Sequence, residues 1–149
     1  MSKMDTVKNH WVVCVGMAGA IGFGAGVWAQ SAASQPTYVS AEGDRLKILL
    51  DRNSLGSSDV DVGELTFPAN TNSGEHVHGA TEIFYILSGE LEHVVNGKSQ
   101  VLKPGMLGFV RPPDQVIHKV GPSGPAKAVV IWVPGGEAAR VVAKWRREP

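Results

Sequence analysis

The chain has 149 residues, of which 43% are hydrophobic and 19% charged, and its 14 basic residues equal its 14 acidic ones. This length and composition fit one modest globular domain and exclude a chain with the composition of a disordered protein. A formal charge of zero gives no support to a nucleic-acid partner, because nucleic-acid binding usually requires a basic surface.

Residues 1–33 have the pattern of an export signal. Two lysines precede an almost uncharged stretch over residues 11–29, and the small-residue run SAAS follows it. This order predicts a signal peptide cleaved after Ala29 or Ala33, and hence a periplasmic or secreted protein. The alternative is a membrane anchor retained over residues 11–29, which are nearly long enough to span a bilayer. The membrane is a predicted partner only in that second case.

The only cysteine, Cys14, lies inside this N-terminal segment. Residues 34–149, which we expect to form one domain, therefore form no disulfide and contain no catalytic thiol. An oxidising compartment is compatible with such a composition.

From Gln35 onward the sequence consists of short runs of β-forming residues, each ended by Gly, Pro, Asn or Ser. This rhythm predicts an all-β sandwich or barrel, and about eight strands in one domain are typical of a jelly roll. The strands are expected at residues 46–50, 62–67, 82–88, 90–95, 99–103, 106–111, 116–120 and 126–133.

The pair Asn96-Gly97 separates two of these runs and predicts a hairpin over residues 90–103. Asn-Gly is the preferred type I′ turn, because both central residues need a positive φ. Near the C-terminus, residues 137–147 show the one helical pattern of the chain, with an apolar stripe opposite its basic residues. We interpret it as a short helix that packs on the sheet through Ala138, Val141, Val142 and Trp145.

Three side chains that bind metals lie within the stretch HVHGATE. His76 and His78 point to the same side only if the chain is extended, because strand side chains alternate. Glu82 follows after a turn at Gly79, and His118 lies in a later β segment that can return beside them. Imidazole and carboxylate together suit a divalent ion such as Mn, Fe, Co, Ni, Cu or Zn. We therefore expect a metal site where donors from separate segments converge.

The same stretch resembles the cupin family. HVHGATEIFYILSG is similar to the first cupin motif, H-x-H-x3-E-x6-G, especially in the germin branch, and RPPDQVIHKV is similar to the second motif, P-x-G-x2-H-x3-N. The resemblance covers roughly residues 38–134 and implies an all-β double-stranded β-helix, the cupin jelly-roll barrel, around one divalent transition-metal ion (Mn, Fe, Ni, Cu or Zn). The ligands that it implies are His76, His78, Glu82 and His118.

Three positions depart from these motifs. Asn70, six residues before His76, stands where the full first motif usually begins with Gly. The change is mild because Asn tolerates left-handed backbone angles. Gln115 and Pro122 replace a Gly and the final Asn of the second motif, so nothing is carried over to them. His93, outside both motifs, alternates with apolar residues on its strand, which favours a partly buried structural imidazole over a ligand or catalytic group.

Alternation along the strand at residues 82–88 places Phe84 and Ile86 on the face of Glu82, with Tyr85 on the other face. Together with Leu107, Phe109 and Val130, Phe84 and Ile86 are expected to form an apolar wall beside the metal. The opposite face is also apolar, so it must be covered by a second sheet or another subunit. This favours a homodimer, which cupins commonly form.

Three imidazoles and one carboxylate around an octahedral ion leave two positions for dioxygen or a chelating substrate. The leading interpretation is a metal-dependent oxidoreductase of the dioxygenase type acting on a small organic compound, with Glu82 as both ligand and catalytic base. One alternative is a non-catalytic cupin that binds a small molecule or sugar. Another is a metal-dependent isomerase or lyase.

Overall fold

The computed structural model describes residue 31 and residues 35–149. Residues 1–33, for which we predicted a cleaved signal peptide or a retained membrane anchor, lie outside this part of the chain except for Ser31. Within the described part, no helix is long and apolar enough to cross a membrane.

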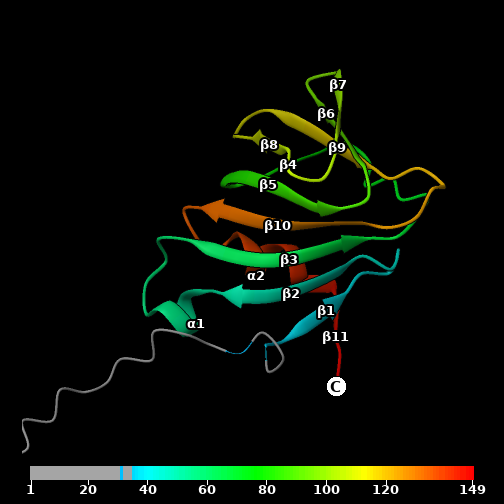
Figure 1. Ribbon diagram of the computed structural model, residues 1–149. Helices are drawn as coiled ribbons and strands as arrows, with labels where there is room; N and C mark the ends of the chain where they lie inside the picture. Colours follow the sequence, from blue (N-terminus) through cyan, green and yellow to red (C-terminus); the bar gives the residue numbers. More distant parts are fainter. Residues whose placement is uncertain (1–30, 32–34) are drawn as a thin grey trace, which may run out of the picture. The chain divides into compact units, whose positions relative to one another are not determined.

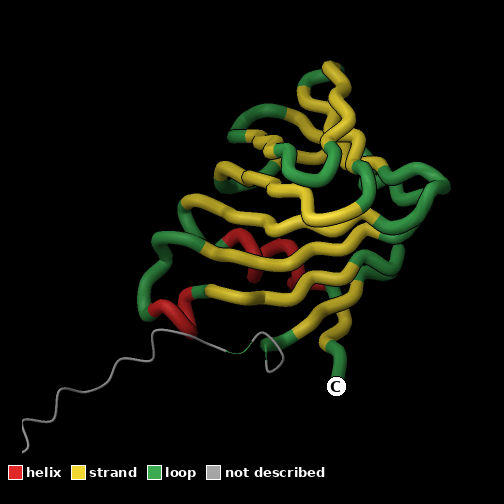
Figure 2. Tube along the Cα trace, viewed as in Figure 1, coloured by secondary structure: helices red, strands yellow, loops and turns green. Residues whose placement is uncertain are grey.

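The described residues form two antiparallel sheets. Their strands are β1 (Thr37–Val39), β2 (Arg45–Leu50), β3 (Asp61–Phe67), β4 (His76–Val77), β5 (Thr81–Ser88), β6 (Leu91–Val95), β7 (Lys98–Leu102), β8 (Leu107–Val110), β9 (Gln115–Lys119), β10 (Ala126–Val133) and β11 (Arg146–Arg147). The larger sheet has the order β11-β1-β2-β3-β10-β5-β8 and the smaller one β4-β9-β6-β7 (Figure 1). In the described part of the chain, the helical turns are α1 (Arg52–Leu55) and, behind β3 in this view, α2 (Glu137–Val141) with the 3-10 turn η2 (Val142–Lys144) (Figure 2).

All eight predicted strands are present, and their ends differ from the predicted ones by at most one residue. The prediction missed β1, β4 and β11, each of only two or three residues, because so short a run shows no period. The predicted hairpin is confirmed: Val95 pairs with Lys98, and Asn96 and Gly97 have φ of 48° and 76°. Asn70 also has a positive φ, 63°, as the comparison with the first motif predicted.

The core lies between the two sheets, since side chains from both enter one buried cluster. On β5, Glu82, Phe84 and Ile86 are buried, whereas Tyr85 is 45% and Leu87 42% exposed. The predicted alternation is therefore confirmed, and it directs the Glu82 carboxylate into the interior.

The inward direction expected of Leu107 and Phe109 is wrong, because both are 58% exposed. On β8 it is Gly108 that faces inward, and a Cβ added there would collide with the Leu102 side chain. The interior has no room for a larger side chain at Gly108, although Val110, two residues further along, is buried there; Leu107 and Phe109 lie on the opposite face of the strand. They lie across from β5 and form an outer apolar face, which consists of Tyr85, Leu87, Leu107 and Phe109.

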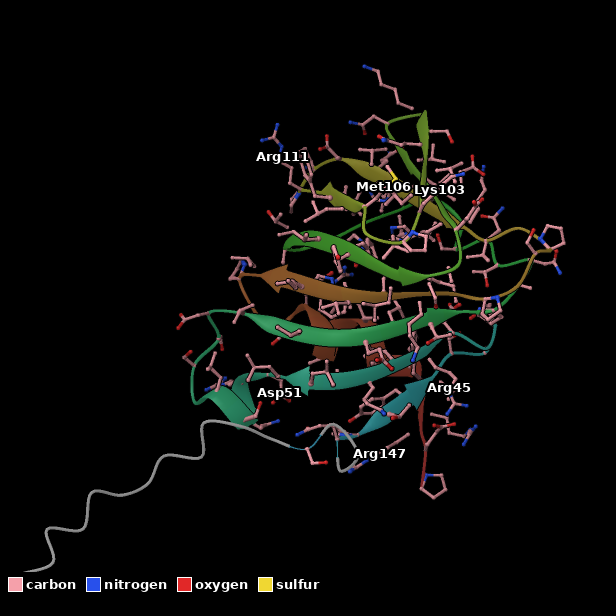
Figure 3. The ribbon with its side chains drawn as sticks, in the orientation of Figure 1. Arg45, Asp51, Lys103, Met106, Arg111 and Arg147 are labelled. Carbon is pink, nitrogen blue, oxygen red and sulfur yellow. The ribbon has the colours of Figure 1, made fainter. Side chains whose placement is uncertain are left out.

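The C-terminal helix is shorter than the predicted 137–147. It changes to a 3-10 turn at residue 142, and Trp145 is extended, with φ of −88° and ψ of 150°. Arg146 and Arg147 instead pair with β1 as β11; Arg147 is labelled in Figure 3. Glu148 forms a salt bridge with Arg45 on β2 at 2.5 Å. The residues after Trp145 therefore continue as a strand at the edge of β1 and not as a further helical turn. The predicted apolar stripe is confirmed, with Ala138 in the core and Val141, Val142 and Trp145 packed against it.

Candidate metal centre

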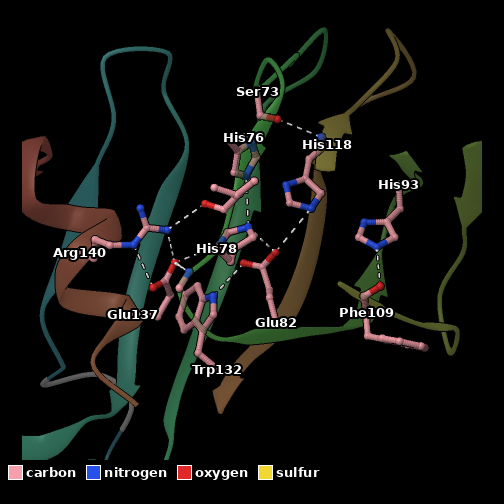
Figure 4. Close-up of polar contacts among 12 residues, drawn as sticks. Ser73, His76, His78, Glu82, His93, Phe109, His118, Trp132, Glu137 and Arg140 are labelled. Atoms are coloured by element: carbon pink, nitrogen blue, oxygen red, sulfur yellow. Dashed lines mark hydrogen bonds and ion pairs between the residues drawn. The ribbon is translucent and has the colours of Figure 1, made fainter. Parts of the chain in front are cut away.

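The four side chains selected from the sequence lie together in the interior (Figure 4). His76 lies on β4, His78 directly follows it, Glu82 lies on β5 and His118 on β9. β4 pairs with β9 so that His76 is opposite Val116, and His118, two residues further along, therefore faces the same side. Strand register brings the distant histidine to the other three residues.

Their donor atoms are close to one another. His76 Nε2 lies 3.2 Å from His78 Nε2, and His78 Nε2 lies 2.9 Å from Glu82 Oε2. His118 Nε2 approaches the same carboxylate oxygen at 3.6 Å. One oxygen and three ring nitrogens thus gather in a small volume.

Burial and neighbouring charges affect these residues in different ways. Burial lowers the pKa of His118 well below 6.5, and the nearby histidines lower it further, so this ring is neutral at pH 7. Burial also lowers the pKa of His78, but the carboxylates of Glu82 and Glu137 outweigh it and raise the pKa above 6.5. Burial raises the pKa of Glu137, yet its hydrogen bonds, above all to Arg140, leave that pKa below 4.5. Glu137 is therefore ionised at neutral pH.

Hydrogen bonds to the outer nitrogens determine which nitrogen of each neutral ring has a free lone pair. His76 Nδ1 lies 3.0 Å from the Gly74 carbonyl oxygen, and His78 Nδ1 lies 3.1 Å from Glu137 Oε1. Both oxygens only accept, so Nδ1 carries the proton in each ring. The two Nε2 atoms then face each other with lone pairs at 3.2 Å. Such a contact is repulsive unless a proton or a cation lies near it.

Glu82 is oriented by Trp132, whose indole Nε1 donates to Oε1 at 2.8 Å. The other oxygen, Oε2, and His118 Nε2 are buried and have no hydrogen-bond partner in the described chain, although Oε2 lies 2.9 Å from His78 Nε2. An unpartnered buried polar atom costs about 1–3 kcal/mol. A shared cation would satisfy both atoms.

Residues 31 and 35–149 contain no group of three or more His, Cys, Asp or Glu side chains already arranged to hold a metal ion. The donor set nevertheless fits one. Neighbouring ligands at about 2.1 Å from an octahedral ion are roughly 3 Å apart, and two of the separations here are 2.9 and 3.2 Å. The 3.6 Å separation between His118 and Glu82 would have to shorten by about half an ångström.

A cavity of about 270 Å³ opens on these donors and includes the four residues in its lining. A larger cavity, of about 640 Å³, contains none of them and lies beside α1 and α2. Of the predicted apolar wall only Phe84 lines the smaller cavity; Ile86 and Val130 are buried elsewhere in the core. The remaining apolar lining is Leu65, Phe67, Val77, Trp132, Val141 and Trp145.

His93 lies beside the donor set and not within it. It is opposite His118 in the β6–β9 pair, and the two rings stack with centroids 5.3 Å apart. Its Nε2 lies 3.1 Å from the Phe109 carbonyl oxygen, and burial lowers its pKa. The predicted burial of His93 is confirmed, since it is 5% exposed, and its structural role stays a prediction.

The sequence analysis did not identify three residues that lie around the donors: Trp132, Glu137 and Arg140. Trp132 contacts Glu82, and Arg140 binds the carboxylate of Glu137, which in turn accepts from His78. Alternation on β10 could have placed Trp132 inside, since Val130 and Ala128 share its face. No pattern marked Glu137, because its function depends on where the last helix lies.

The sequence of residues 63–134 matches the family model described as a cupin domain. The chain therefore contains a cupin domain. The two antiparallel sheets are the jelly roll that the motifs implied, and the match includes Glu82, His118 and the HVH stretch.

Solved structures share this cupin fold at low sequence identity. An RmlC-like cupin from Shewanella frigidimarina has a TM-score of 0.62 and 16% identity over 73% of this chain and 92% of its own. A predicted oxalate decarboxylase from Thermotoga maritima has a TM-score of 0.60 and 20% identity, over 71% and 98%. The polyketide cyclase RemF from Streptomyces resistomycificus has a TM-score of 0.62 and 16% identity, over 81% of each chain. No curated protein sequence matches this chain. At these identities the structural likeness establishes the fold alone.

Proposed function

We propose that the cupin domain binds one divalent transition-metal ion through His76, His78, Glu82 and His118. The observation that supports this most directly is the pair of buried, unpartnered atoms, Glu82 Oε2 and His118 Nε2, which face each other across 3.6 Å. The Nε2 lone pairs of the other two rings point to the same region. A cation relieves the repulsion among these atoms and satisfies both unpartnered ones.

We further propose that the domain is an oxidoreductase of the dioxygenase type that acts on a small organic substrate. The ion would supply Lewis acidity and, if redox-active, one-electron chemistry with dioxygen. The chain itself provides a cavity of about 270 Å³, near the lower limit of the roughly 300–1,000 Å³ of ligand pockets. Its aromatic lining from Phe67, Phe84 and Trp132 excludes water and suits a substrate with an apolar part.

Glu82 is the residue to which we assign proton transfer. Its Oε2 lies beside the Nε2 atoms of His78 and His118, and the residue is 2% exposed. Trp132 holds Oε1, so a proton taken from a substrate in the cavity would go to Oε2 once that oxygen has loosened from the ion. His118 remains neutral because burial depresses its pKa, and it therefore acts as a lone-pair donor rather than as an acid.

A redox-neutral metal-dependent isomerase or lyase is the second candidate. It uses the same donors and the same base, and a polyketide cyclase shares the fold. A third candidate, a sugar-binding or small-molecule-binding cupin, would use the metal to hold its ligand without turnover. These alternatives differ from the leading proposal in one measurable property, the consumption of dioxygen.

The test begins with metal content. Chelator-treated protein is titrated with Mn, Fe, Ni, Cu and Zn, and binding of one ion per chain with a rise in melting temperature is expected. His118→Gln should abolish binding, whereas His93→Gln, a matched change in the stacked neighbour, should leave it within about threefold of wild type. Equal loss in both variants, or no binding by wild type, would overturn the ligand assignment.

Turnover is then measured on each metal form with a panel of small carbonyl, phenolic and sugar-acid compounds. Dioxygen uptake that requires both substrate and metal supports the oxidoreductase. Product formed equally well under argon supports the isomerase or lyase. Binding without product in either atmosphere supports the non-catalytic alternative.

A further inference from the structure

The short C-terminal helix places a buried carboxylate against one of the proposed ligands. The side chain of Glu137 is 4% exposed, and its Oε1 lies 3.1 Å from His78 Nδ1. The same oxygen accepts a hydrogen bond from the Gly79 backbone N–H at 3.2 Å. Glu137 therefore contacts both the His78 ring and the backbone next to it.

Arg140, one turn further along, fixes this carboxylate from the other side. Its Nε donates to Glu137 Oε2 at 2.9 Å, and its Nη2 donates to Glu137 Oε1 and, at 3.2 Å, to the Val77 carbonyl oxygen (Figure 4). The guanidinium thus joins the helix to the strand segment that precedes His78. Glu137 is consequently held at both oxygens.

The attachment of the helix to the domain does not depend on the contact with His78. Asp61 Oδ2 accepts hydrogen bonds from the backbone N–H groups of Gly136 at 2.7 Å and Ala138 at 2.9 Å, and Ala138 is buried in the core. A buried carboxylate is costly unless specific partners compensate it. The position of Glu137 is therefore better explained by what it does to His78 than by the anchoring of α2.

The backbone at Gly79 is adapted to this approach. A Cβ at Gly79 would lie 3.0 Å from Glu137 Oε2, tighter than ordinary contacts. A side chain there would require the carboxylate to shift by a few tenths of an ångström. Glycine in the turn between His78 and Glu82 thus allows the close approach of Glu137.

We propose that Glu137 is the positioning residue of this site. It holds the His78 ring with the proton on Nδ1 and the Nε2 lone pair directed to the ion, and Arg140 keeps Glu137 in place. This inference rests on the proposed metal site. General experience with metal proteins supports the expected size of the effect, since loss of a group that orients a ligand histidine typically weakens metal affinity about 10–100-fold.

Three variants of the full chain distinguish positioning from simple anchoring. Glu137→Leu removes the acceptor but keeps a similar size, and Glu137→Gln keeps an acceptor oxygen without the charge. Asp61→Asn is the matched control, because it weakens the attachment of α2 without touching His78. Zn²⁺ affinity is measured for each by competition with a chelator. In metal-free protein at alkaline pH, the ¹⁵N shifts of the His78 ring report its tautomer.

Glu137→Leu is expected to weaken Zn²⁺ binding about 10–100-fold and to abolish the preference for the Nδ1–H tautomer. Glu137→Gln should restore the tautomer and most of the affinity, while Asp61→Asn lowers the melting temperature and leaves affinity within about threefold of wild type. If Asp61→Asn weakens binding as much as Glu137→Leu, or if the tautomer is the same in Glu137→Leu and wild type, the inference is overturned. Failure of wild type to bind any metal would refute the proposed function, and the tautomer measurement would still test the effect of Glu137 on His78.

Discussion

Replacement of Trp132 by Phe removes the hydrogen bond that orients Glu82. The bond is 2.8 Å long, and Trp132 and Glu82 are only 1% and 2% exposed. Loss of a hydrogen bond to a buried charged group costs about 1.5–3 kcal/mol. The roughly 40 Å³ vacated by the smaller ring adds about 1 kcal/mol. We therefore expect Trp132→Phe to lower the free energy of unfolding of the metal-free protein by about 3 kcal/mol.

A double-mutant cycle with Glu82→Gln separates the hydrogen bond from the loss of packing. In the Glu82→Gln background the acceptor is a neutral amide oxygen, and the bond contributes only about 1 kcal/mol. Trp132→Phe should then cost about 2 kcal/mol, which leaves a coupling energy of about 1 kcal/mol. Urea unfolding with a chelator present measures all four proteins. Costs that agree within about 0.3 kcal/mol in both backgrounds would refute a charge-assisted bond between these side chains.

Three further changes test other parts of the structure. Gly89→Ala should destabilise the protein far more than Gly97→Ala in urea unfolding. Both residues have positive φ, but only at Gly89 would a Cβ collide with a backbone carbonyl oxygen, that of residue 125. Equal losses of unfolding free energy in the two variants would contradict this. We expect the protein to dimerise through the outer apolar face, so Leu107→Glu with Phe109→Glu should give a monomer by analytical ultracentrifugation; an unchanged mass would argue against this interface. Burial raises the pKa of Asp44 above 3.8 and leaves its Oδ1 without a partner in the described chain. The neutral Asp44 carboxyl contributes stability that is complete below pH 3.8 and is lost as the pH rises through its folded pKa. Asp44→Asn should therefore raise the melting temperature at pH 7 but not well below pH 3.8. A gain that is the same at both pH values would contradict the assignment.

Local chemistry was sufficient to predict the eight longer strands of the described residues and the direction of β5. Side chains of an extended segment alternate between two faces, and the burial along β5 follows this period, which directs Glu82 inward. The Asn96-Gly97 turn needed only the preference of these two residues for positive φ. Motif spacing also identified the set His76, His78, Glu82 and His118, although the sequence alone did not show that their donors would approach within 3.6 Å.

Properties that depend on neighbours from distant strands were mispredicted or missed. Leu107 and Phe109 face outward because Leu102, on another strand, occupies the interior beside Gly108. The last helix ends early because β1 offers a strand edge to Arg146 and Arg147. Neither Leu102 nor the edge of β1 can be inferred from the local sequence of the residues that it affects.

The environment of the four donors shows the same division. Their residue types and spacing are properties of the sequence, because a short extended segment places His76 and His78 on one side by geometry alone. Trp132 and Glu137, which orient Glu82 and His78, lie fifty and fifty-nine residues away from them along the chain. Only the pairing of β10 with β5 and the packing of α2 on the sheet bring them into contact. The sequence by itself therefore determined which atoms can bind a metal, and the tertiary structure decided how those atoms are oriented, because orientation depends on hydrogen bonds between segments that meet only after folding.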